Sequence, residues 1–396
     1  KKKPELLAPA GTLEKLKIAF RYGADAVYFG GEKFSLRAAA KNFTFEDMEE
    51  GVRIAHKLGK KMYCTVNVMP RNDEIKELLE YVKKLEEIGI DAVLVSDLGV
   101  FSIIKDNTNI PIHISTQANT VNYAACNMWH KLGAERVVLG RECSLKEIQE
   151  IQKNISEDLE LEIFIHGAMC ISYSGRCLLS AYMNGRSANG GFCSHSCRWD
   201  YDLLSTPNGA KKLAESGELV LREHQRPDEY FPVFEGEDFT AILSSKDLCM
   251  IDHLEDLKNA GVDSLKIEGR MKSTYYVALV TRAYRKAIDA LEGKITAEEA
   301  APYIAELDNV SHRASTTGFY YNRSEADKTT TGASDSKYQL TAEIGKAYSE
   351  SQFEDLYNHV CESTIDFDDE KELNLMIRTA KQLGLYNKLR SLNDSL

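Results

Sequence analysis

The sequence is poor in the features that mark membrane, secreted and strongly cationic proteins. No apolar stretch approaches the roughly 18 residues that a transmembrane helix needs. Cysteine accounts for only nine of 396 residues, an odd number and too few for a disulfide-built scaffold. Acidic residues outnumber basic ones, 61 to 49, and the resulting net charge of −12 argues against binding DNA or RNA through bulk charge. Because residues 1–4 also lack an apolar signal-peptide core, we expect a cytoplasmic protein with no membrane or DNA partner.

Several common catalytic motifs are also missing. The chain has neither the His-Glu-x-x-His pattern of zinc peptidases nor the Gly-x-Ser-x-Gly turn of serine hydrolases. No glycine-rich dinucleotide turn follows the first apolar run. A cysteine–histidine nucleophile pair is still conceivable, because His166 and His195 lie near cysteines. A peptidase therefore remains an alternative, but its catalytic group would have to be something other than the zinc ion or the serine nucleophile of those two motifs.

Short apolar runs alternate with helical patterns through the first two-thirds of the chain. The runs cover residues 6–8, 26–29, 62–67, 92–95, 112–115, 136–139, 161–165 and 264–267. Most are continuously apolar, as in strands of a parallel sheet that is covered on both faces. Eight such units predict an α/β fold with a (β/α)8 TIM-barrel-like core. An open doubly wound sheet is the alternative, and the missing glycine-rich turn disfavours it.

The regular pattern is interrupted once and ends early, which predicts the domain organisation. We expect the barrel to occupy residues 1–292, with a long cysteine-containing insertion at 166–240 after the seventh strand. A C-terminal extension would follow, made of an irregular linker at 293–350 and an acidic helical tail at 351–396. Long loops are usually functional, and this one leaves the end of a barrel where active sites lie.

The strongest chemical signal is four cysteines within the insertion. Cys170, Cys177, Cys193 and Cys197 fall within 28 residues, whereas the other five cysteines are scattered along the chain. A cytosolic protein disfavours disulfides, so three interpretations stay open: a [4Fe–4S] cluster, a structural zinc ion, or no metal. The first pair has six intervening residues, which is unlike the usual zinc knuckle, while the second pair has three.

Polar residues at the predicted strand ends are the other candidates for a site, because barrels place their chemistry there. We predict Lys266, Glu268, Arg270 and His166 as catalytic residues. The first three alternate along the eighth strand and should therefore point to one side. Charges inside a barrel are costly unless they are paired or functional. The polar residues predicted to bind substrate are Arg37, Gln117, Arg141 and Arg176.

Residues 162–180 carry a family resemblance. They read Glu-Ile-Phe-Ile-His-Gly-Ala-Met-Cys-Ile-Ser-Tyr-Ser-Gly-Arg-Cys-Leu-Leu-Ser, which resembles the signature of the collagenase-like peptidase family U32 at every specified position. Residues 5–11, 23–28, 113–118 and 266–270 resemble the same family, so that the likeness covers about residues 4–330. The family name keeps the peptidase alternative open.

Within that family, residues 193–199, 225–230 and 245–248 resemble a branch that hydroxylates tRNA. This likeness implies a [4Fe–4S] protein that forms 5-hydroxyuridine at the tRNA wobble position. Prephenate would be the hydroxyl donor instead of O2, and arginines would suit such a dicarboxylate. The resemblance implies Cys170, Cys177, Cys193 and Cys197 as ligands, with Cys249 as the fallback for the fourth. A sister branch hydroxylates a ribosomal RNA cytidine, which is a further alternative.

The tail departs from the tRNA-hydroxylating branch. The resemblance implies a β-rich C-terminal extension, but residues 351–396 read as helical and hold nine acidic and five basic residues, a net charge of 5 − 9 = −4. Such a segment repels phosphate. We therefore expect a protein partner to supply the RNA contacts of that extension.

Overall fold

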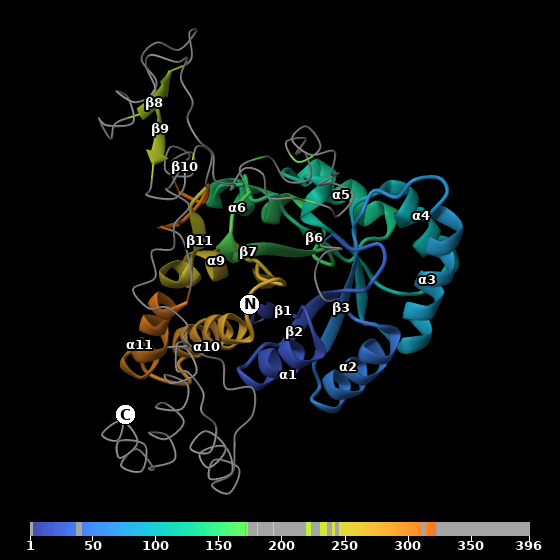
Figure 1. The fold of residues 1–396 in the computed structure, drawn as a ribbon, viewed down its shortest axis with the longest axis horizontal. Helices are drawn as coiled ribbons and strands as arrows, with labels where there is room; N and C mark the ends of the chain where they lie inside the picture. The colour runs from blue at the N-terminus through green and yellow to red at the C-terminus, as the bar shows by residue number, and fades with distance from the viewer. Residues whose placement is uncertain are drawn as a thin grey trace, which may run out of the picture. The chain divides into compact units, whose positions relative to one another are not determined.

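The computed structural model describes residues 3–36, 42–170, 245–310 and 314–321, and the isolated residues 172, 180 and 193. It also describes the backbone of residues 219–222, 230–235 and 240–241. Figure 1 shows these parts as ribbons coloured along the chain. The predicted tail at 351–396 and four of the predicted site residues, Arg37, Arg176, Cys177 and Cys197, lie outside the described residues.

Eight parallel strands form a closed barrel. They are β1 (Glu5–Pro9), β2 (Ala26–Gly30), β3 (Lys61–Val66), β4 (Ala92–Val95), β5 (Ile112–Ile114), β6 (Arg136–Val138), β7 (Glu160–Ala168) and β12 (Ser264–Ile267). Each strand pairs with the next along the chain, and β12 pairs in parallel with both β1 and β7. This second pairing closes the ring, so the predicted (β/α)8 fold is confirmed and the open sheet is wrong.

Helices cover the outside of the barrel (Figure 1). They are α1 (Leu13–Arg21), α2 (Phe45–Lys57), α3 (Ile75–Ile88), α4 (Leu98–Asn107), α5 (Tyr123–Leu132), α6 (Leu145–Asn154), α9 (Leu254–Ala260) and α10 (Thr274–Leu291). Local sequence sets their ends. Thr44 and Asp47 form a capping box at the start of α2. Gly89 ends α3 at a φ of 85°, a left-handed conformation that glycine adopts without strain.

Burial on both sides explains why the strand sequences are almost continuously apolar. Leu7 on β1, Phe29 on β2 and Val93 on β4 are all completely buried. Their neighbours in each strand are buried too, because one set of side chains fills the barrel and the other contacts the helices. None of the described helices combines the length and hydropathy that crossing a bilayer requires.

The insertion contains strands, although the sequence analysis treats it as a loop. β7 continues to Ala168, beyond its expected end, and β11 (Asp247–Cys249) pairs with it antiparallel. β13 (Ser315–Thr316) then pairs with β11 in parallel. A separate antiparallel sheet is formed by β8 (Leu219–Arg222), β9 (Tyr230–Glu235) and β10 (Thr240–Ala241). These strands are short and pair within their own segment, so they do not continue the βα pattern.

The chain packs back onto the barrel after α10. Helix α11 (Ala297–Ala305) begins with a capping box at Thr296 and contacts α10. Further on, the buried Tyr320 donates a hydrogen bond from its hydroxyl to the Phe164 carbonyl of β7, with 2.5 Å between the oxygens. The predicted boundaries at 292 and 350 stay predictions, but the segment after 292 includes this helix and this contact.

Candidate functional site

Lys266 lies on β12 inside the barrel and is 3% exposed. Its ammonium donates to Glu162 Oε1 over 2.7 Å and lies 4.4 Å from the centre of the Tyr28 ring. Burial lowers the pKa of Lys266, and the Glu162 carboxylate opposes that shift. The predicted catalytic lysine thus pairs with the buried carboxylate of Glu162, a residue that was not among the predicted site residues.

A buried ion network extends from Glu162 towards the N-terminal ends of the strands. Arg136, the first residue of β6, donates to Glu162 over 3.1 Å, to Glu5 over 2.7 Å and to Glu160 over 2.6 Å. Burial alone would raise the pKa of Glu162, but the Lys266 and Arg136 charges hold it below its usual value. Because strand N-termini form the face opposite barrel active sites, we assign this network to stability.

Glu268 and Arg141 form an ion pair just beyond the ends of their strands. Arg141 Nη2 lies 3.2 Å from Glu268 Oε2, and the Arg141 guanidinium carbon lies 3.9 Å from the centre of the Phe164 ring. Both charged side chains keep some contact with solvent, with 14% and 21% of their area exposed. A guanidinium stacked on a ring and paired on one edge keeps further N–H groups for an anionic ligand.

Arg270 is almost completely buried at the same end of the barrel. Its Nη1 donates to Ser35 Oγ over 2.8 Å and to Thr65 Oγ1 over 3.0 Å. The backbone of β2 leaves room for this guanidinium at Gly30, where a Cβ atom would collide with both Arg270 Nη1 and Ser35 Oγ. These two hydroxyl groups hold the Arg270 guanidinium in a fixed position at the C-terminal end of the barrel.

Tyr28 is the residue on which these groups converge. Its hydroxyl donates to the Ile267 carbonyl over 2.9 Å. Burial raises the pKa of Tyr28 well above its ordinary value, with smaller effects from the nearby charges of Glu268, Arg270 and Arg141. The structure therefore brings four predicted site residues together around Tyr28 at the C-terminal mouth of the barrel: Lys266, Glu268, Arg270 and Arg141.

Neutral polar groups lie at the next strand ends. The buried atoms Ser96 Oγ, Gln117 Oε1 and Asn119 Oδ1 have no hydrogen-bond partner within the described part of the chain. They follow β4 and β5, so they lie on loops at the same mouth as the charged residues. An unpaired buried polar group costs about 1–3 kcal/mol, which a water or a ligand can recover. Gln117 thus keeps its predicted place among substrate-binding candidates.

His166 is turned away from its expected direction. Alternation along β7 would put it on the same side as Glu162 and Phe164, but the pairing register with β12 shifts just before His166. Such a bulge changes the direction of the following side chains. The His166 ring packs against Tyr276 and Tyr284 of α10, and Nδ1 lies 3.3 Å from the Tyr284 hydroxyl.

The described cysteines divide into buried and accessible thiols. Burial raises the pKa of Cys64, Cys126 and Cys143 to about 12, so these thiols are unsuited to bind a metal as thiolates. Cys170 is exposed and follows β7, while Cys193 is partly exposed. These two predicted ligands fit the donor chemistry of an iron–sulfur cluster. No group of three or more His, Cys, Asp or Glu side chains within the described residues could itself hold a metal ion.

The fallback ligand Cys249 lies beside His166 in the strand register. It is on β11, directly opposite His166 on β7. Its Sγ lies 3.9 Å from the Tyr284 hydroxyl, which also donates to the Ile165 carbonyl and accepts from the Met250 amide. Burial raises the pKa of Cys249. The competing assignments of the fourth ligand, Cys197 and Cys249, both stay predictions.

Comparison with known proteins decides the family. Residues 11–330, which include the insertion and every barrel strand except β1, match peptidase family U32. The chain belongs to peptidase family U32. The tRNA hydroxylation protein P of Escherichia coli is 42% identical over 82% of this U32 chain and 76% of its own length. The tRNA hydroxylation protein P1 of Bacillus subtilis is 44% identical over 81% of this chain and 71% of its own.

A ribosomal RNA enzyme is a more distant relative of this U32 protein. A 23S rRNA 5-hydroxycytidine synthase of Escherichia coli is 33% identical over 86% of this chain, but the match covers only 48% of that enzyme. The resemblance deduced from residues 162–180 is thus confirmed, and these relatives are named for RNA hydroxylation.

Proposed function

We propose that this U32 protein is an enzyme that hydroxylates RNA, and that its product is 5-hydroxyuridine at the wobble position of tRNA. The observation that supports this best is the identity of 42–44% to two proteins named for tRNA hydroxylation, over more than 70% of their lengths. The lower identity and partial coverage of the ribosomal RNA synthase favour tRNA over a ribosomal cytidine. The barrel mouth, with its converging charged groups, is the proposed place of the reaction.

The cationic groups of the mouth suit an anionic hydroxyl donor, for which we propose prephenate. Arg141 can present N–H groups to a carboxylate, and a guanidinium can do so in bidentate fashion. Arg270 adds a second positive charge at the same end of the barrel. Arg37 and Arg176, which lie outside the described residues, are proposed to join them. Lys266 would hold a positive charge beneath the substrate, and Glu268 would accept or return a proton at the edge of the mouth.

The cluster is proposed to be [4Fe–4S], held by Cys170, Cys177, Cys193 and Cys197. When bound, such a cluster supplies electron transfer or an iron atom that polarises a ligand. Support comes from the exposed thiol of Cys170, which follows the end of β7, and from the partly exposed thiol of Cys193.

Anaerobically purified protein is expected to be brown and to contain about four iron atoms per chain. Cys177→Ser should lose the iron, because one thiolate ligand is missing. Cys126→Ser is the matched control and should keep it, since Cys126 is fully buried in α5. Iron and zinc are measured by elemental analysis. Stoichiometric zinc without iron would contradict the proposal, and iron loss in Cys249→Ser but not in Cys197→Ser would make Cys249 the fourth ligand.

A strain lacking the gene is expected to lose wobble nucleosides derived from 5-hydroxyuridine when it grows without oxygen. Mass spectrometry of tRNA nucleosides measures this loss, and anaerobic growth removes any route that depends on O2. A plasmid copy should restore the modification, whereas a Cys177→Ser copy should not. If tRNA is normal but a ribosomal hydroxycytidine disappears, the sister-branch activity is correct instead.

The peptidase alternative has a distinct outcome in the same study. Unchanged nucleosides, together with gelatin cleavage that one cysteine substitution abolishes, would establish it. We also propose that a protein partner supplies RNA contacts, because the acidic residues at 351–396 repel phosphate. Copurification from a tagged strain would identify such a partner.

A further inference from the structure

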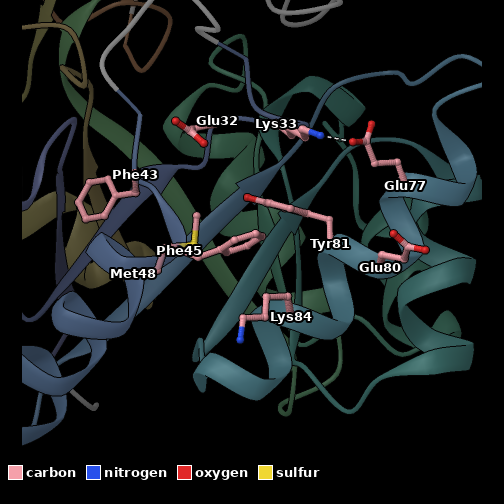
Figure 2. Close-up of a pocket in the computed structure, with 9 residues that line it drawn as sticks. All are labelled: Glu32, Lys33, Phe43, Phe45, Met48, Glu77, Glu80, Tyr81 and Lys84. Atoms are coloured by element: carbon pink, nitrogen blue, oxygen red, sulfur yellow. Dashed lines mark hydrogen bonds and ion pairs between the residues drawn. The ribbon is translucent and has the colours of Figure 1, made fainter.

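A cavity of about 230 Å³ lies between α2, α3 and the loop that follows β2 (Figure 2). We call it the α2–α3 cavity. Its lining includes Phe43, which precedes α2, Phe45 and Met48 from the first turn of α2, and Tyr81 from α3. Neither Tyr28 nor any of the charged residues around it lines this cavity. The α2–α3 cavity is therefore distinct from the barrel mouth. A ligand could bind in it whether or not the protein hydroxylates tRNA.

The inner wall of the cavity is apolar and aromatic. Phe43 and Met48 are each 1% exposed and Tyr81 is 6% exposed, whereas Phe45 is 36% exposed at the opening. The ring centres of Phe45 and Tyr81 lie 5.7 Å apart. Figure 2 shows these two rings beside each other, with Met48 next to Phe45. Such a wall can bury a small apolar group and present ring faces to a cation.

Tyr81 is held in place before any ligand binds. Its hydroxyl lies 3.7 Å from Cys64 Sγ. The backbone at Gly31 makes room for it, because a Cβ atom there would collide with the hydroxyl and lie 2.7 Å from Met48 Cε. Burial raises the pKa of Tyr81 well above its ordinary value, and the carboxylate of Glu32 adds to that rise. The ring is therefore a fixed, neutral phenol at neutral pH.

Charge around the opening favours a cation. Three carboxylates, Glu32, Glu77 and Glu80, and two lysines line the cavity. Lys33 pairs with Glu77, as the dashed line in Figure 2 shows, and Lys84 lies 3.7 Å from Glu49 and 3.4 Å from Glu87. Each lysine thus has a carboxylate neighbour that offsets part of its charge. Glu32 and Glu80 form no ion pair or hydrogen bond within the described part of the chain, and both lie at the solvent-exposed edge of the cavity, where their charges can attract a cation.

We propose that the α2–α3 cavity binds a small organic cation, in which an ammonium group is carried on a short aromatic or apolar chain. The apolar part would contact Phe45 and Tyr81, and the ammonium would lie near Glu32 and Glu80. The volume is below the roughly 300–1,000 Å³ of pockets for larger ligands, so a nucleotide does not fit. An anion such as a dicarboxylate would be repelled, which separates this ligand from the proposed hydroxyl donor.

Isothermal titration of the full-length protein with 2-phenylethylammonium tests the proposal. Saturable binding at one site is expected. 2-Phenylethanol, which has a similar shape and no charge, should bind about tenfold more weakly, and 3-phenylpropionate should not bind. Equal binding of the amine and the alcohol, or no saturable binding of the amine, would overturn the proposal.

Variants locate the site. The double variant Glu32→Gln/Glu80→Gln should weaken amine binding about tenfold, because both carboxylates are lost. Phe45→Ala should also weaken binding, and as a partly exposed residue it can be replaced with little effect on folding, which the melting temperature checks. Glu46→Gln is the matched control: it removes a neighbouring exposed charge on α2 that does not line the cavity. If Glu46→Gln weakens binding as much as the double variant, the effect is one of net charge and the site is wrong.

Discussion

Replacing Glu162 by Gln is expected to lower the free energy of unfolding by about 3–5 kcal/mol. Glu162 is fully buried and contacts both Lys266, over 2.7 Å, and Arg136, over 3.1 Å. Without that carboxylate, the buried Lys266 ammonium would have no carboxylate at hydrogen-bond distance within the described part of the chain, and one of the contacts of Arg136 would also be lost. Urea unfolding followed by circular dichroism measures the change.

Two further variants make this prediction specific. Glu157→Gln, an exposed change on the preceding loop, should stay within about 0.5 kcal/mol of wild type. Glu162→Gln/Lys266→Met should recover much of the lost stability, because it removes the unpaired charge as well. A loss below about 1 kcal/mol in Glu162→Gln would mean that the network does not stabilise the barrel.

The same carboxylate predicts a dependence on pH. The folded protein holds the pKa of Glu162 below its usual value, so folding favours the ionised form. The resulting stability is fully present above the unfolded pKa of about 4.3 and is lost as the pH falls through the lower folded pKa. Glu162→Gln should therefore show a shallower loss of stability in acid than wild type.

Arg270→Ala is expected to reduce tRNA hydroxylation about 100-fold while the protein keeps its iron. We place Arg270 on the substrate, and removing one charged donor from a preorganised site typically costs 10²–10³ in rate. Its guanidinium, between Ser35 and Thr65, is fixed before the substrate arrives. Complementation of the deletion strain, with nucleoside mass spectrometry, measures the effect.

Iron content and melting temperature separate this effect from misfolding. Arg270→Lys keeps the positive charge but loses the planar guanidinium, whose N–H groups donate in fixed directions. Its activity should therefore fall between that of Arg270→Ala and wild type. Arg282→Ala is the control, because Arg282 pairs with Glu306 on the outer helices. If Arg270→Ala retains wild-type activity, or if it loses iron and activity together, Arg270 does not act on the substrate as proposed.

Local sequence accounts for most of the barrel. The apolar runs at 92–95 and 264–267 coincide with β4 and β12, because short buried strands are bounded by polar turns that the sequence makes plain. Capping residues such as Thr12 and Thr44 likewise set the starts of α1 and α2. These signals act over three or four residues, so they can be interpreted without knowledge of the remaining chain.

The arrangement of the site was less predictable, because it depends on contacts between distant residues. Arg136 meets Glu5 across 131 positions of sequence, and Arg270 meets Ser35 across 235. Only the closing register of the ring brings these pairs together. The bulge before His166 is a further case. Strict alternation along β7 would point the His166 ring into the barrel, whereas the ring packs against helix α10 outside it.

The direct pairing of β12 with β7 has a consequence for how this protein can change over time. The ring of hydrogen bonds closes where Ser264–Ile267 of β12 pairs with residues 162–166 of β7, and no described residue between Ala168 and Asp247 takes part in that pairing. The segment that carries the clustered cysteines is therefore an insertion in the sequence between β7 and β12, two strands that pair directly with each other. Changes in the length or sequence of this insertion can therefore alter the chemistry of the protein without disturbing the strand pairing that closes the barrel.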